Sequence, residues 1–112
     1  MQNLEQIRAK NALDATPDIR EGGRDGGDVL SGFPALIINN GLLATIAFSM
    51  KQGGGYAQTY GAIARHLQSI GLIPENVELI SHLANGDSTQ LRLCTAEALA
   101  YLAYLKRFGK KG

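Results

Sequence analysis

The stretch from Phe33 to Phe48 limits the fold more than any other part of this 112-residue sequence. Drawn as a helix, it carries apolar residues on nearly all sides, namely Leu36, Ile37, Ile38, Leu42, Leu43, Ile46 and Phe48. A helix that is apolar on most sides must be buried among other helices. We therefore expect one central helix that begins at residues 31–34, has Pro34 in its first turn and runs to about Lys51. Gly41 inside it costs about 1 kcal/mol against alanine, which indicates the close approach of a neighbouring helix.

Helical patterns also appear on both sides of this stretch. Residues 2–15 predict a short amphipathic helix that ends at Thr16-Pro17, because the residue before a proline avoids the α conformation. Residues 18–32 contain five glycines and predict a flexible loop. Three more helices are expected: residues 56–70, a short helix that Pro74 opens and Asn85-Gly86 closes, and residues 88–108.

These patterns predict an all-α fold, a small single-domain bundle of five to six helices over residues 1–112. Hydrophobic residues make up 45% of the chain, which is enough for one packed core. The apolar stretches are too short and too polar to span a membrane, and the N-terminus lacks the layout of a signal peptide. The lone Cys94 cannot form an internal disulfide, so we expect a cytoplasmic protein with no membrane contact.

The residue inventory contains no catalytic constellation. His66, His82 and Cys94 lie singly on separate predicted elements, whereas a metal site needs several ligands at set spacing. Cys94 has apolar helical neighbours and is expected to be a core thiol. The glycine clusters match no phosphate-binding loop. We therefore expect a binding protein rather than an enzyme, without a metal, a cofactor or a small-molecule substrate.

The last predicted helix shows a local excess of positive charge that the net charge of +1 hides. Past Asp87 the sequence has five basic residues against one acidic residue, Glu97. One helical sector holds Arg92, Ala96, Ala103 and Arg107, with Lys106 at its margin, and Lys110 and Lys111 extend it. Small alanines between arginines would let a polyanion approach closely. Basic residues in a last turn are also common on solvated helices, because they suit the helix dipole.

Two stretches resemble a known family. FPALIINNGLLATIAF, over residues 33–48, and TAEALAYLAYLKRFGKK, over residues 95–111, are similar to the two motifs of the small subunit of the Cmr complex, the type III-B CRISPR RNA-guided effector. Tyr104 stands where many relatives have tryptophan. The resemblance implies a non-catalytic, all-α subunit of a ribonucleoprotein. Its copies would stack beside the backbone subunits that hold the guide RNA, and the assembly would enclose the duplex of guide RNA and target RNA.

Such a duplex is broadly A-form and varies in sequence, so a useful contact must depend on phosphates and shape. The residues predicted to contact RNA are Arg92, Lys106, Arg107, Lys110 and Lys111, with Lys51 and Arg65 as weaker candidates.

Two other functions remain open from the sequence, and a third is disfavoured. The chain could be the small subunit of the related type III-A (Csm) complex, or a helical protein-interaction scaffold without RNA contact. A helix-turn-helix regulator is disfavoured, because its recognition helix would be the acidic segment ENVELISHL, which offers few donors to base edges.

Overall fold

The computed structural model describes residues 1–21 and 26–109, with side chains left undescribed from residue 20 to residue 28. The described residues form six helices and no strand: α1 (Leu4–Glu21), α2 (Gly26–Asn40), α3 (Leu42–Gln52), α4 (Gly54–Ser69), α5 (Leu79–Ala84) and α6 (Ser88–Gly109). The predicted all-α bundle is therefore confirmed, with six helices.

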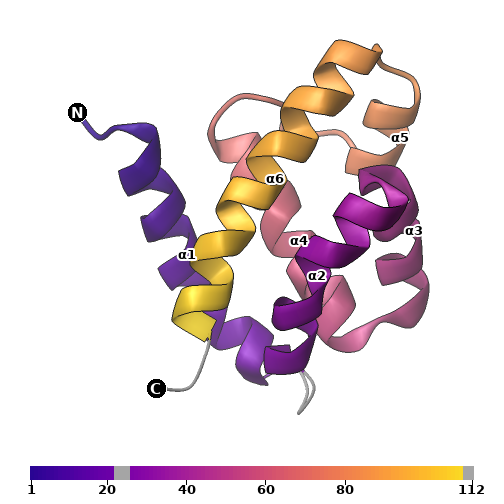
Figure 1. Cartoon of the computed structure of the whole chain (residues 1–112). Coiled ribbons are helices and arrows are strands. Elements are labelled where there is room, and N and C mark those ends of the chain that lie inside the picture. Colours follow the sequence, from indigo (N-terminus) through magenta and orange to yellow (C-terminus); the bar gives the residue numbers. More distant parts are fainter. Residues whose placement is uncertain (22–25, 110–112) are drawn as a thin grey trace.

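The long helix α6 organises the bundle. It packs against α1, α2 and α4, while α3 packs on the far side against α2, α4 and α5 (Figure 1). The inner face of α6 lies in the core, since Ala98, Leu102 and Leu105 are fully buried and Leu91 packs against the same core. Cys94 is also fully buried, as predicted for a core thiol, and burial raises the pKa of its sulfur.

The last turn of α6 fits tightly between α1 and α2 because it ends in glycine. A Cβ placed on Gly109 would lie 2.6 Å from Leu30 Cδ1 and 3.3 Å from Thr16 Cγ2. Leu30 is itself buried, so it has little room to move. Gly109 thus brings the C-terminal end of α6 directly against α1 and α2.

The prediction that the first helix ends at Thr16-Pro17 is wrong. Helix α1 continues through Pro17 to Glu21. A proline inside a helix removes one hydrogen bond and costs about 3 kcal/mol. The extra turn compensates, because it buries Ile19 in the core. Just before the proline, the Thr16 hydroxyl also donates a hydrogen bond to the carbonyl of Ala12.

The glycine-rich loop expected over residues 18–32 is largely replaced by helix. Residues 18–21 belong to α1 and residues 26–32 to α2, so only residues 22–25 of that range lie outside the described residues. Val29 and Leu30 are core residues, and their burial stabilises a helix start that the glycines alone disfavour. Pro34 accordingly lies in the middle of α2 rather than in a first turn.

The expected continuous helix through Gly41 is also wrong. Gly41 has φ +89°, a conformation that L side chains rarely adopt, and the chain breaks there into α2 and α3. The break lets the two halves bury different faces. Ile37 before it and Leu42 and Ile46 after it are buried, whereas Ile38 stays 70% exposed.

The remaining helices agree with the sequence pattern, with shifted ends. The predicted third helix is α4, and the predicted short helix is α5, which begins at Leu79 rather than at Pro74. At the start of α6 the backbone N–H of Gln90 donates to Asp87 Oδ1 at 2.8 Å, so Asp87 caps the helix. The Gln90 side chain contacts other parts of the bundle. Its Nε2 lies 3.3 Å from the Leu72 carbonyl oxygen and 3.0 Å from His82 Nε2.

Candidate nucleic-acid interface

The solvent-facing side of α6 carries the predicted basic sector. Arg92, Lys106 and Arg107 are all exposed, as are the alanines Ala96 and Ala103 between them. Within the described residues, none of the three cations forms an ion pair. Arg92 has one long hydrogen bond, 3.5 Å from Nη2 to Thr89 Oγ1. The charges of Arg92, Lys106 and Arg107 are therefore available to an external anion.

The sector is two basic ends rather than one continuous patch. Arg92 and Arg107 are fifteen residues apart, which corresponds to roughly 22 Å along the helix axis. Between the two basic ends the exposed residues are apolar: Leu93, which is 55% exposed, and then Ala96 and Ala103 further along the helix. A single phosphate cannot bridge this distance, so the two ends would contact phosphates several nucleotides apart. Lys110 and Lys111 lie outside the described residues.

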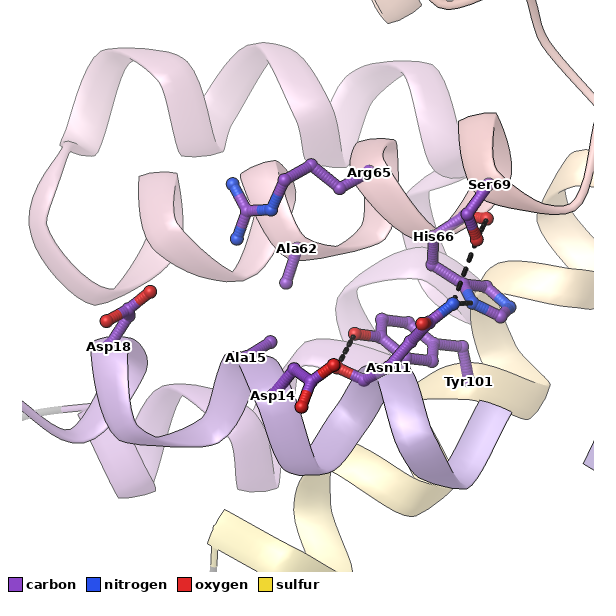
Figure 2. A pocket seen from close by; sticks show the side chains of 9 residues that line it. All are labelled: Asn11, Asp14, Ala15, Asp18, Ala62, Arg65, His66, Ser69 and Tyr101. Atoms are coloured by element: carbon purple, nitrogen blue, oxygen red, sulfur yellow. Dashed lines mark hydrogen bonds between the residues drawn. The ribbon is translucent and has the colours of Figure 1, made fainter. Parts of the chain in front are cut away.

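The two weaker candidates are not on α6. Lys51 is exposed in the last turn of α3, which packs against α2, α4 and α5. Arg65 is exposed on α4 and lines a groove between α1 and α4 that Asp14 and Asp18 also line (Figure 2). The structure thus brings together Lys106 and Arg107, and it distributes Arg92, Lys51 and Arg65 over other parts of the surface.

On its inner side, α6 contributes a buried acid that the sequence analysis did not assign to a role. The Glu97 carboxylate is 7% exposed and accepts two hydrogen bonds from the Arg8 guanidinium, each 2.7 Å long. It also lies 2.8 Å from His66 Nε2. One acidic side chain therefore joins α6 to α1 and α4. The available signal was a single acid in an apolar helix, but its partner is 89 residues away in the sequence.

The bonding pattern around His66 fixes its neutral tautomer. Asn11 Nδ2 donates to Ser69 Oγ, whose own hydroxyl donates to the His66 carbonyl, so this amide nitrogen also faces His66 Nδ1 at 2.9 Å as a donor. His66 Nδ1 then accepts, and Nε2–H donates to Glu97. The ring is stacked on Tyr101, with centroids 4.1 Å apart and planes 5° from parallel.

Burial and hydrogen bonding together set the charges of this network. Burial lowers the pKa of His66 and outweighs the opposing effect of the Glu97 carboxylate. For Glu97, burial raises the pKa, but the hydrogen bonds from Arg8 and His66 outweigh it and the net shift is downward. Hydrogen bonding to Glu97 raises the pKa of Arg8. The network is therefore an ionised Arg8–Glu97 pair with a neutral His66, and its polar atoms satisfy one another.

Residues 1–21 and 26–109 contain no group of three or more potential metal ligands. None of the helices in these residues is long and apolar enough to cross a membrane.

Fold and surface together define a small helical bundle with exposed cations along one side of its longest helix. Residues 4–111 match the model of the family described as CRISPR-associated protein (Cas_Cmr5), so the chain belongs to that family. The resemblance to the small subunit of the type III-B Cmr complex is thereby confirmed, and the chain is a subunit of a Cmr complex. No curated protein matches the sequence at a significant level.

Proposed function

We propose that this chain is a non-catalytic subunit that contacts the duplex of guide RNA and target RNA through the exposed cations of α6. The observation that carries the proposal is the state of Arg92, Lys106 and Arg107, which are exposed and without ion pairs in the described residues. Fixed cations on a rigid helix bind phosphates without reading the base sequence. A complex that uses many different guides requires that kind of contact.

The rigid support of α6 favours the same role. The helix is anchored on its inner side to α1 by the Arg8–Glu97 pair and packs against α2 and α4, so its outer cations keep a constant spacing. We infer that copies of the chain stack beside the guide-bearing backbone subunits in the cytoplasm. The near-neutral net charge of +1 supports stacking, because a strongly basic protein would repel its own copies.

A scaffold that binds only protein is the second candidate. The apolar exposed surface at Leu93, Ala96 and Ala103 favours it, since that part of α6 offers no charge to RNA. The two functions differ in what charge reversal on α6 does. A pure scaffold would keep whatever weak RNA binding it has, whereas an RNA-contacting subunit would lose it.

The test is a titration of an RNA duplex with the full chain at low salt, using Lys106→Glu and Arg107→Glu. Each change removes one phosphate contact and adds repulsion, so we expect RNA binding to be about tenfold weaker. The slope of log affinity against log salt concentration should become shallower by roughly one. Lys10→Glu is the matched control. It makes the same change of charge on α1, where Lys10 already pairs with Asp14 at 3.1 Å.

Circular dichroism should show unchanged helicity in all three variants. Equal binding by the wild type and both α6 variants would remove this helix from the RNA interface. Association with the backbone subunit is measured separately, by co-purification after ribonuclease treatment. A chain that stays bound there while α6 charge reversal has no effect on RNA would be a scaffold.

A further inference from the structure

The α1–α4 groove is a hollow with a largely polar and charged lining that the cations of α6 do not explain. It consists of two adjoining hollows of about 270 and 340 Å³, which share Asp18 and Arg65. Asn11 and Ser69 line one end and Gln58 the other. Figure 2 shows the groove from the side, with α1 below and α4 above.

The groove contains polar groups that the protein does not satisfy. Within the described residues Arg65 forms no ion pair and no side-chain hydrogen bond, although Asp18 lines the same hollows. Asp18 also has no ion pair in this part of the chain. The Gln58 Oε1 atom is buried and has no hydrogen-bond partner among the described residues.

The floor of the groove is made of small residues. Ala15 on α1 and Gly61 and Ala62 on α4 leave the space open. The guanidinium of Arg65 lies along α4, since a Cβ placed on Gly61 would be 3.4 Å from Arg65 Nη1. A flat group can therefore enter between the helices with the guanidinium on one side and the carboxylates of α1 on the other.

This mixture of charges selects the ligand. A simple cation would be repelled by Arg65 and a simple anion by Asp14 and Asp18. The best match is a planar group with two acceptors at one edge and N–H donors next to them. Guanine has this pattern. Its O6 and N7 accept a bidentate pair from arginine, and its N1–H and N2–H groups can donate to a carboxylate. Adenine places an amino group where guanine has O6, so it would oppose the guanidinium.

We propose that the α1–α4 groove binds a single unpaired guanine of an RNA strand, with Arg65 on its O6/N7 edge and Asp18 on its N1/N2 edge. The proposal rests on the RNA contact proposed above. The volumes suit one base rather than a duplex, since they lie near the lower end of ligand pockets, roughly 300–1,000 Å³.

The experiment compares the binding of guanosine, inosine and adenosine monophosphates to the full chain by NMR titration. All three carry the same phosphate, so their affinity ratio reports the base alone. We expect guanosine monophosphate to bind about tenfold more tightly than adenosine monophosphate, which is within the 1–3 kcal/mol of one bidentate base contact. Inosine monophosphate, which lacks the N2 amino group, should fall between them.

Arg65→Gln and Asp18→Asn should each abolish the preference for guanine. Both side chains are exposed, so the fold should persist. The matched control is Glu75→Gln between α4 and α5, an exposed acid outside the groove, which should leave the ratio unchanged. Equal binding of the three nucleotides, or an equal effect of Asp18→Asn and Glu75→Gln, would overturn the proposal.

The RNA-duplex titration separates this inference from the proposed function. If Arg107→Glu weakens duplex binding while the nucleotides bind equally, only the guanine site is refuted. If duplex binding ignores α6 while the guanine preference depends on Arg65, the duplex contact is refuted, and the groove is a nucleotide site of another kind.

Discussion

Replacing Glu97 with alanine tests the buried network most directly. The substitution removes the acceptor of three short hydrogen bonds, at 2.7, 2.7 and 2.8 Å. It leaves the His66 ring, which is completely buried, and the Arg8 guanidinium, which is 23% exposed, without their partner. Removing one member of a buried pair costs about 3–5 kcal/mol. Because water can still reach part of Arg8, we expect a loss near the lower limit, about 3 kcal/mol.

The measurement is urea unfolding followed by circular dichroism, with a thermal melt beside it. For a domain of this size a loss of about 3 kcal/mol corresponds to a Tm lower by roughly 12 °C. Glu97→Gln should lose less, because its amide oxygen still accepts from one partner. Asp14→Ala is the control. It breaks the exposed Lys10–Asp14 pair, whose side chains are 63% and 67% exposed, and should cost less than about 0.5 kcal/mol.

A double-mutant cycle with Arg8→Met then isolates the pair. We expect the two substitutions together to cost clearly less than the sum of their separate effects, because each removes the same ion pair. A loss below about 1 kcal/mol for Glu97→Ala, or strictly additive effects in the cycle, would refute the view that this pair anchors α1 to α6.

Two further predictions concern the backbone and the stacked tyrosine. Gly41→Ala should destabilise the chain by about 1–2 kcal/mol in urea unfolding, because φ is +89° there. No atom lies within 4 Å of the new methyl group, so the whole cost comes from the backbone conformation. A gain of about 1 kcal/mol would instead support one continuous helix. Tyr101→Phe should cost about 1 kcal/mol at neutral pH, since it removes the 3.2 Å hydrogen bond to the Asn11 carbonyl. Burial raises the pKa of Tyr101 to about 12, so above pH 10 the unfolded chain releases this proton while the folded chain keeps it. The wild type should therefore lose up to about 1.4 kcal/mol more than the variant per pH unit between pH 10 and 12, and parallel curves would contradict the shift.

The sequence predicted the helical class and most helices because these depend on local periodicity. It failed at Pro17 and Gly41 for a common reason. Local propensity predicts that the first helix ends before Pro17, but α1 continues because the next turn buries Ile19. Local propensity also predicts one helix through Gly41, but the chain turns there and buries Ile46 on α3. Both outcomes depend on contacts with distant helices, which a local pattern cannot contain.

The basic residues of α6 were found because charge on an apolar helix is visible in the sequence. Their division into two ends was missed, since the helical projection used for the prediction ignores position along the axis. The pairing of Arg8 with Glu97 was missed for a different reason. It joins residues 89 positions apart, and nothing in one sequence links them.

That pairing also decides which cations are left for a partner. Arg8 is neutralised by Glu97 inside the bundle, and Lys10 is paired with Asp14 on the surface of α1. The other described basic side chains, all without ion pairs in this part of the chain, are Lys51, Arg65, Arg92, Lys106 and Arg107. Four of these five follow residue 52, so the internal pairs remove positive charge from α1 and increase the asymmetry already present in the composition. If this charge asymmetry guides RNA to α6, Glu97→Gln should release Arg8 and increase non-specific RNA binding at α1. The fraction of RNA binding that Arg107→Glu removes should then be smaller.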